Sequence, residues 1–246
     1  MSVCVSTIVF GWYSEFIPVY IYSMLKAYPN FFVRIFLQGN LPESVSRLLK
    51  QFPSEMRSNY EVSERYMPSE DFSGQRGKTF RWYLPKSVFK GYEYGYIGDV
   101  DFAIVAETPS FLQVHLKHCL KTGLPYSNMV RPGTKRLSGL HFICVDEYFD
   151  KISPLIVGNP PNVISSNEEE LYNLVMKAFG SVPKDIFRPH HGIHLGLLRG
   201  GGLKRLSKEN MNRALILKDD PFYKDVLFTG CGSKTRAIYK QIMKLW

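Results

Sequence analysis

The sequence predicts one α/β domain in which helices flank a mixed, mainly parallel central sheet. The opening segment, residues 3–13, is short, apolar and rich in β-branched and aromatic residues, as in a buried strand. Residues 16–28 then place apolar side chains at helical spacing, and Pro29 ends that run. Residues 32–37 form a second apolar segment. A strand, a helix and a strand in this order are typical of a βαβ unit, whose two strands lie parallel.

The rest of the 246-residue chain continues the alternation without a repeat or a linker, so a single domain spanning residues 1–246 is expected. The expected helices cover residues 42–52, 79–89 with a break near Pro85, 111–121, 146–152, 168–179 and 234–246. The expected strands cover residues 60–62, 94–105 and 140–145. The polar stretches 54–78 and 158–167 are expected to be loops, apart from the short strand at 60–62.

Composition excludes a disordered chain and favours anionic partners. Hydrophobic residues make up 45% and charged residues 22%, as in folded globular proteins. The net charge of +9 suits nucleic acid, an anionic membrane surface or a phosphorylated substrate. The four cysteines include no CxxC pair, so neither a zinc site nor a disulfide framework is expected. We recognise no secretory signal and no apolar run of about 18 residues, and expect a cytoplasmic protein, soluble or peripheral to the inner face of a membrane.

The acidic triplet Asp99-Val100-Asp101 carries the strongest chemical signal in the sequence. It lies inside the apolar segment 94–105, where a carboxylate is costly unless it is paired or binds a cation. Because alternate residues of an extended chain point to one side, we expect both carboxylates to face the same site. A divalent cation held by carboxylates and phosphate oxygens would neutralise them. The alternative is a strand end at which Asp99 caps a turn and Asp101 pairs with an arginine.

A second concentration of functional side chains lies late in the chain. His190, His191 and His194 are three of the six histidines and fall within five positions. Imidazole is an acceptable ligand for Mn²⁺ beside two carboxylates, so we expect a histidine at a metal, in the order of preference His191, His194, His190. The Gly-rich, basic segment 200–205, which includes Lys204, offers backbone N–H groups and cations to a diphosphate, or is a solvated surface loop.

Three further motifs accompany the triplet in a fixed order. They are TFRWYLP at 79–85, RLSGLHF at 136–142 and RPHHGIHLG at 188–196. In this order they resemble the glycogenin and lipopolysaccharide galactosyltransferase group of GT-A glycosyltransferases. That group has an Arg-x-x-x-Pro helix, an apolar strand ending in Asp-x-Asp, a small residue followed by Gly at the start of a strand, and a late histidine. The chain departs from the group after Gly196, where Leu-Leu-Arg stands instead of a Lys-Pro-Trp ending, so the ligand histidine stays open.

The resemblance implies a GT-A (Rossmann-like) fold and metal-dependent transfer of a sugar from a nucleotide-sugar donor, with UDP as the nucleotide, to a hydroxyl of a glycan, glycolipid or protein. It implies retention of configuration at the sugar. It places Mn²⁺ or Mg²⁺ on Asp99 and Asp101 with His191 or His194, and gives Asp99, Asp101 and Arg81 catalytic roles. The residues expected at the donor are Phe10, Gly11, Arg76, Arg81, Asp99, Val100, Asp101, Ser138, Gly139 and Lys204.

The C-terminal segment 233–246 is predicted to be a basic amphipathic helix. Ile238, Ile242 and Leu245 share one helical stripe, with lysines beside it. Helices of this kind can lie on anionic membranes, which makes peripheral membrane contact one hypothesis. The alternative is a terminal helix that packs on the core.

Two other functions compete with sugar transfer. A phosphohydrolase of the haloacid-dehalogenase type also uses Asp-x-Asp at a strand end, and Asp219-Asp220 would imitate its late acidic pair. The βαβ unit before the triplet and Ala103, two positions beyond Asp101, oppose it. A non-enzymatic nucleic-acid-binding module would suit the basic, Tyr-rich composition. No dense basic run or nucleic-acid motif supports that hypothesis, so nucleic acid is not expected as a partner.

Overall fold

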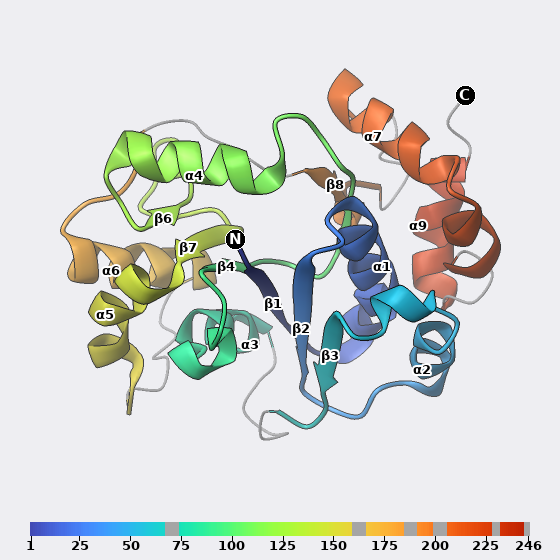
Figure 1. Cartoon of the computed structure of the whole chain (residues 1–246), viewed down its shortest axis with the longest axis horizontal. Helices are drawn as coiled ribbons and strands as arrows, with labels where there is room; N and C mark the ends of the chain where they lie inside the picture. The colour runs from blue at the N-terminus through green and yellow to red at the C-terminus, as the bar shows by residue number, and fades with distance from the viewer. Residues whose placement is uncertain (67–73, 159–165, 185–190, 199–205, 228–231, 244–246) are drawn as a thin grey trace.

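The centre of the molecule is a six-stranded sheet in the order β3-β2-β1-β4-β7-β6 (Figure 1). The computed structural model describes residues 1–66, 74–158, 166–184, 191–198, 206–227 and 232–243. Four strands pair in parallel: β1 (Val3–Val9), β2 (Phe31–Leu37), β3 (Tyr60–Ser63) and β4 (Tyr94–Ile97). The remaining two, β6 (Tyr126–Ser127) and β7 (His141–Cys144), join in antiparallel fashion. The predicted mixed, mainly parallel sheet is therefore confirmed.

The sheet separates two hydrophobic clusters. Side chains of β1 point alternately to the two faces of the sheet and so contribute to both clusters. Val3 and Val5 belong to one cluster, whereas Cys4 and Ile8 belong to the other. The first cluster includes side chains of α1 (Ile17–Ala27), α2 (Glu43–Leu49), α4 (Phe111–Thr122), α7 (Lys208–Lys218) and α9 (Ser233–Met243). The second includes side chains of α5 (Val145–Ile156) and α6 (Asn167–Phe179). Helices thus flank the sheet, as Figure 1 shows.

The predicted strand 94–105 is wrong in the respect that matters most for function. The chain leaves the central sheet after Ile97, and β5 (Phe102–Ile104) pairs instead with β8 (Gly192–His194) in a separate two-stranded sheet. The last contacts with β1 are made by Gly98, whose carbonyl accepts from Thr7 Oγ1 at 2.8 Å. Beyond this point β1 continues to Val9 beside β2, whereas β7 begins at His141, opposite Ile97. Residues 98–101 lie outside the strands, between β4 and β5.

The helix predicted over 79–89 is also wrong. Its residues form two 3₁₀ turns, η3 (Phe80–Tyr83) and η4 (Lys86–Phe89), and η3 continues from a short helix, α3 (Gly74–Thr79). The break lies at Pro85, which has no N–H to donate and holds Leu84 in an extended conformation. The predicted loop 54–78 therefore ends in a helix, and it also contains a 3₁₀ turn at Ser54–Met56.

The late part of the chain holds elements that the sequence patterns did not predict. These are β6, β8, a 3₁₀ turn η5 (Leu195–Leu198), α7 and a π-helical turn η7 (Tyr223–Leu227). A serine cap opens α7, because Ser207 Oγ accepts from Asn210 N at 3.2 Å. The helix predicted over residues 146–152 was too short, since α5 runs on through Pro154 to Ile156.

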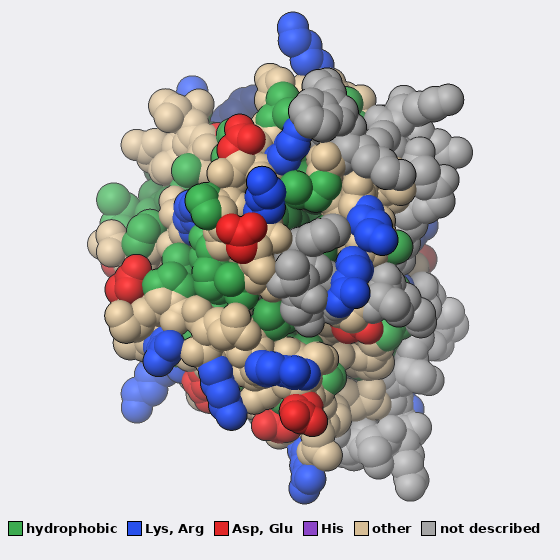
Figure 2. Space-filling view, turned by 90° about the vertical axis from the view of Figure 1, so that its right-hand side faces the viewer, with side chains coloured by type: hydrophobic (Ala, Val, Ile, Leu, Met, Phe, Trp, Pro, Cys, Tyr) green, Lys and Arg blue, Asp and Glu red, His purple; other side chains and the backbone are tan. Residues whose placement is uncertain are grey.

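The C-terminal helix packs on the core, as the alternative to membrane contact requires. Ile238 and Ile242 of α9 are buried with Tyr239 in the first cluster. The stripe that suggested membrane contact therefore faces the protein, and Leu245 lies outside the described residues. Figure 2 shows the face that carries α7 and α9, where basic side chains are spread among acidic and apolar ones. Within the described ranges, no helix is long and apolar enough to cross a membrane.

A pair of substitutions on α9 tests this packing. Ile242→Ala should lower the free energy of unfolding by about 2–5 kcal/mol, because it removes a fully buried side chain from the core. Lys240→Ala, at an exposed position of the same helix, should leave it unchanged within error. Urea denaturation of the two variants measures both values. Equal stabilities would mean that the stripe is not part of the core.

Candidate functional site

The two carboxylates of the triplet lie where the chain leaves the central sheet. Since β1 and β4 are parallel, their carboxyl ends meet at one edge, which is where open α/β sheets bind ligands. The side chain of Asp99 is 37% exposed there, whereas that of Asp101 is 7% exposed. Both line one cavity of about 320 Å³. The carboxylates therefore face a common site, although they stand in a turn and not in a strand.

Arg81 forms an ion pair with Asp99 at this edge. The guanidinium comes from η3 and is buried, with its carbon 4.4 Å from the centre of the Trp82 ring. A buried cation is tolerated when it is paired, and Asp99 supplies that charge. Among the described residues, Arg81 Nε finds no hydrogen-bond partner. The site thus contains a fixed cation with a donor that its present partner does not use.

Gly139 lies against this ion pair. A Cβ atom at that position would stand 2.8 Å from Asp99 Oδ2 and 3.0 Å from Arg81 Nη2. Real Cβ contacts are longer, so a side chain here would push the two charges apart. Its neighbour Ser138 is engaged locally, since its hydroxyl donates to the Leu140 carbonyl at 3.1 Å. The absence of a side chain at Gly139 therefore leaves room for the ion pair between Arg81 and Asp99.

His194 is the histidine that reaches the carboxylates. Its Nε2 is 3.0 Å from Asp101 Oδ2, and its ring stacks on Phe102, its partner across the small sheet. A Cβ at Gly196 would stand 3.2 Å from Asp101 Oδ2 and 2.9 Å from His194 Nε2. A glycine is thus required for the close approach of these two side chains.

His191, the first choice from sequence, lies elsewhere. It is buried, its Nδ1 is hydrogen-bonded to the hydroxyl of Tyr28, and its Nε2 is 3.9 Å from Glu107. The reason is strand geometry: three positions along an extended chain separate His191 from His194, so their side chains point to opposite faces. The structure thus brings His194, and not His191, to the carboxylates of the triplet. His190 lies outside the described residues.

The cavity collects part of the predicted donor set. Its lining is Tyr13, Lys78, Arg81, Asp99, Asp101, Asn167, Glu168, His194, Gly196 and Leu197. A smaller adjoining cavity adds Ile8, Phe10 and Val100. Gly11 opens the turn after β1 with a φ of +58°, which favours glycine. Arg76, half-buried on α3, is not among the described lining residues, and Lys204 lies outside the described residues.

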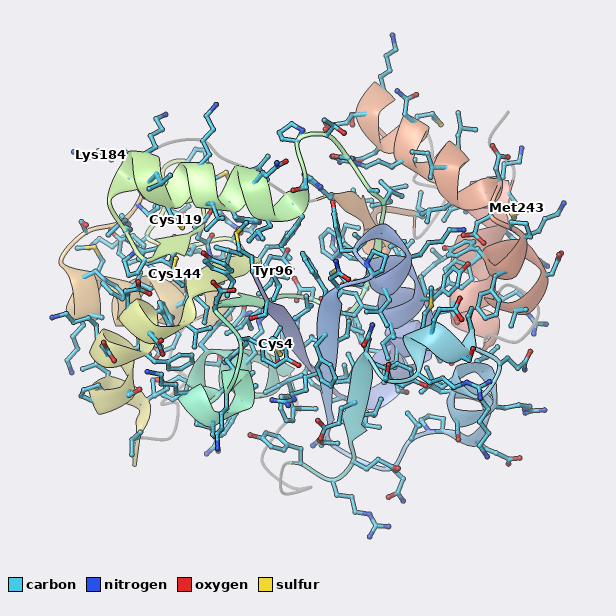
Figure 3. The ribbon with its side chains drawn as sticks, viewed as in Figure 1. Cys4, Tyr96, Cys119, Cys144, Lys184 and Met243 are labelled. Carbon is cyan, nitrogen blue, oxygen red and sulfur yellow. The ribbon has the colours of Figure 1, made fainter. Side chains whose placement is uncertain are left out.

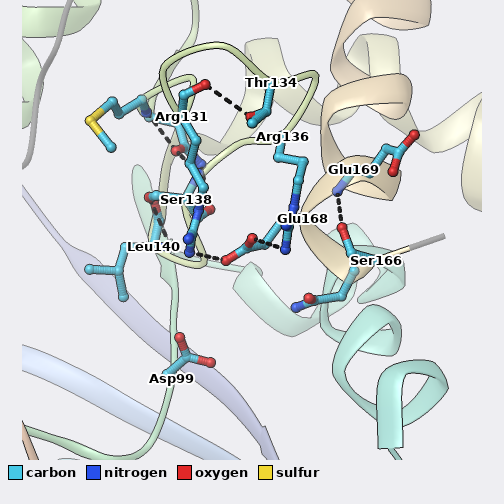
Figure 4. A network of polar contacts seen from close by, with 12 residues as sticks. Asp99, Arg131, Thr134, Arg136, Ser138, Leu140, Ser166, Glu168 and Glu169 are labelled. Carbon is cyan, nitrogen blue, oxygen red and sulfur yellow. Dashed lines mark hydrogen bonds and ion pairs between the residues drawn. The ribbon is translucent and has the colours of Figure 1, made fainter. Parts of the chain in front are cut away.

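Glu168 was not predicted at the site. It lies at the start of α6, is 9% exposed and lines the cavity. Arg131 and Arg136 both form ion pairs with its carboxylate (Figure 4). These arginines come from a chain reversal in which Arg131 N donates to the Arg136 carbonyl at 2.8 Å. Acidic residues are favoured in the first turn of any helix, so nothing in the local sequence indicated that Glu168 is buried at the site.

Several titratable groups near the site are held in their neutral form. Burial, reinforced by the charge of Asp99, raises the pKa of Tyr20. Burial also raises the pKa of Tyr96, labelled in Figure 3, and Tyr20 and Asp99 add to that effect. Burial lowers the pKa of His141, on β7, to about 3. None of these three groups is suited to exchange a proton at neutral pH.

The residue types at the edge suit a hard divalent cation. Two carboxylates and one imidazole form a mixed oxygen and nitrogen donor set around one cavity. Over the described ranges, however, no three His, Cys, Asp or Glu side chains stand close enough together to hold a metal ion. One carboxylate oxygen of Asp99 is engaged by Arg81. The three side chains therefore have the right donor atoms for a divalent cation, but they would have to move closer together to bind one.

No protein-family model and no curated protein matches the chain. Three solved structures of glycosyltransferases are similar to it in backbone fold. Galactosyltransferase LgtC, in complex with donor and acceptor sugar analogs, overlaps with a TM-score of 0.44 at 13% identity, over 70% of each chain. An active-site mutant of LgtC gives 0.46 at 12%, over 91% of this chain and 82% of that one. The glycosyltransferase GlyE of Streptococcus pneumoniae TIGR4 gives 0.45 at 12%, over 71% of this chain and 43% of that one.

Replacing the glycine beside the ion pair tests the geometry of the site. Gly139→Ala should lower the free energy of unfolding by about 1–3 kcal/mol, because the new methyl group overpacks Arg81 and Asp99. The matched control is Gly39→Ala, where a Cβ meets nothing within 4 Å. Urea denaturation compares the two. If both variants keep the stability of the parent, Gly139 does not press on the pair.

Proposed function

We propose that this chain is a metal-dependent glycosyltransferase of the GT-A type, which moves a sugar from a nucleotide-sugar donor to a hydroxyl acceptor. One observation carries the proposal: Asp99 and Asp101 stand at the carboxyl edge of parallel strands, in one cavity with Arg81 and His194. This edge is the place where α/β sheets bind nucleotides. The three motifs around the triplet point to the same activity by their resemblance to GT-A enzymes, and to UDP as the nucleotide.

The charge of the cavity supports a donor that arrives with a cation. The described lining holds three carboxylates, Asp99, Asp101 and Glu168, against the two cations Lys78 and Arg81. Arg131 and Arg136 offset the charge of Glu168. A diphosphate would therefore meet the carboxylates of Asp99 and Asp101, and a divalent cation between them and the phosphate oxygens would remove that repulsion. Asp99, Asp101 and His194 are the residues that would hold Mn²⁺ or Mg²⁺. When bound, the cation supplies Lewis-acid stabilisation of the departing nucleoside diphosphate.

The chain's own side chains fit the remaining tasks. Arg81 is fixed by burial and by Asp99, so it can stabilise the charge that develops on the leaving diphosphate without first being ordered. The acceptor hydroxyl oxygen forms a bond to the anomeric carbon as the bond from that carbon to the diphosphate oxygen breaks, and the hydroxyl proton is released. Asn167 and Glu168 offer an amide and a carboxylate from the wall of the cavity to the hydroxyls of a sugar.

The haloacid-dehalogenase hypothesis loses its second acidic pair. Asp220 is buried and accepts hydrogen bonds from Tyr22 at 3.0 Å and from Lys26. Asp219 and Asp220 line a separate cavity, whose described lining has no residue in common with that of the triplet. The late acids therefore do not join Asp99 and Asp101 in one site.

Thermal unfolding with nucleotide and metal tests the proposal. UDP with Mn²⁺ at a concentration about a hundredfold above Kd should raise Tm by about 5–10 °C, since a ligand that binds only the folded state stabilises it by mass action. UDP without the metal should give a smaller shift. Asp101→Asn, which keeps the shape of the side chain and removes its charge, should abolish the metal-dependent part. The proposal fails if UDP, GDP and CDP, each with Mn²⁺ or Mg²⁺, all leave Tm unchanged.

The two histidines can be told apart by the same assay. His194→Gln should weaken the binding of UDP with Mn²⁺ by about ten- to a hundredfold, because it replaces the imidazole at Asp101. His191→Gln should lower Tm without ligand, because it disturbs a buried contact with Tyr28, and should leave the affinity unchanged. Titration calorimetry gives the affinities. The opposite pattern would make His191 the ligand.

A further inference from the structure

Two cysteines from different elements meet outside the candidate active site. Cys119 lies in the last turn of α4, and Cys144 is the last residue of β7 (both labelled in Figure 3). Cys119 is buried, whereas Cys144 is partly exposed. Both line a second cavity of about 880 Å³, whose described lining has no residue in common with that of the triplet. The function proposed above uses neither thiol.

The register of α4 on β7 brings the two thiols together. Phe142 and Cys144 are two positions apart on a strand, so their side chains point to the same face. His115 and Cys119 are four positions apart on a helix, so theirs share a face as well. The rings of His115 and Phe142 stack with centres 4.7 Å apart. From His115 to Cys119 the helix advances by about 6 Å, and from Phe142 to Cys144 the strand advances by about 6.6 Å. Because the two advances are nearly equal, the cysteines face each other as the two stacked rings do.

Backbone contacts hold this arrangement from both sides. Gly123 ends α4 in the left-handed region, and its N–H donates to the Cys119 carbonyl at 2.9 Å. Two residues later, the Pro125 carbonyl accepts from Cys144 N at 2.8 Å. The short connection from α4 to β6 therefore fixes the end of the helix beside the end of β7. Both side chains line the same cavity, which places the two thiols on one side of this connection.

The two sulfurs are unequal, as a nucleophile and its resolving partner must be. The hydrogen bond from Cys119 lowers the pKa of Cys144, although partial burial and Glu147 oppose it. The same hydrogen bond and burial raise the pKa of Cys119. Cys144 thus has the access to solvent that an attacking thiolate needs, and Cys119 is buried.

We propose that Cys119 and Cys144 are a redox-active dithiol, which a low-molecular-weight disulfide oxidises to an intramolecular disulfide between α4 and β7. The Cys144 thiolate attacks one sulfur of the small disulfide and expels the first small thiolate, leaving a mixed disulfide. Cys119 loses its proton, attacks the Cys144 sulfur and expels the second small thiolate. Two cysteine thiols are oxidised, one small disulfide is reduced to two thiols, and the two protons pass to the expelled thiolates.

Glutathione disulfide is the probe, used on the folded full-length protein carrying Cys231→Ser, since Cys231 lies outside the described residues. After incubation, acid quenching and alkylation, tryptic peptides are analysed by mass spectrometry. The expected product is a disulfide that links the peptide of Cys119 to that of Cys144, with loss of both thiols and recovery on addition of dithiothreitol. Cys4, which is fully buried on the other face of the sheet, should remain a thiol and serves as the internal control.

Two single variants separate the roles of the sulfurs. Cys119→Ser should stop at a stable glutathione adduct on Cys144, since the resolving thiol is missing. Cys144→Ser should slow the reaction about tenfold or more, because the remaining thiol, Cys119, is buried. The proposal is overturned if the folded protein keeps both thiols under these conditions, or if Cys144 in the Cys119→Ser variant collects no adduct. Neither result bears on sugar transfer, so the two proposals fail independently.

Discussion

The ion pair between Arg81 and Asp99 is the contact around which the candidate site is built. A buried guanidinium without a counter-charge would cost several kcal/mol, so η3 keeps its place beside the end of β4 only while Asp99 faces it. Gly139, just before β7, closes the arrangement by leaving room for both charges. Three segments that are distant in the sequence thus converge on one pair, and Arg81 also lines the cavity at the edge of the parallel strands.

The second carboxylate is positioned by different means. Asp101 directly precedes β5, and the pairing of β5 with β8 sets His194 opposite Phe102, with its Nε2 3.0 Å from Asp101 Oδ2. The backbone repeats this link, since Leu195 N donates to the Asp101 carbonyl at 2.8 Å. One acid is therefore tied to the main sheet through an arginine and the other to a separate strand pair through an imidazole. The proposed binding of a cation and a diphosphate would therefore involve both contacts, Arg81 with Asp99 and His194 with Asp101.

The sequence was informative where short-range patterns decide the structure. The opening strand, helix and strand were predicted from the regular spacing of apolar residues. The Asp-x-Asp triplet was expected inside a strand over 94–105, whereas it lies between β4 and β5, after the chain has left the central sheet. The break after Ile97 has no local signal, because apolar residues continue through Phe102 and beyond, and β1 itself runs on to Val9. The choice of His194 over His191 depends on recognising β8 as a strand. The burial of Glu168 could not be predicted either, because its partners Arg131 and Arg136 lie more than thirty positions away.

The glycines around the site limit how it can change. At Gly139, Gly192 and Gly196 even a methyl group would meet an atom at 2.9 Å or less, and the atoms met include Asp99, the Ala103 carbonyl and His194. At Gly192 a side chain would require the backbone to move, and at Gly139 and Gly196 it would displace the charged or imidazole side chains of the site. Anyone who grafts this site onto another scaffold, or searches for distant relatives of the chain, should therefore treat the positions without side chains as part of its signature.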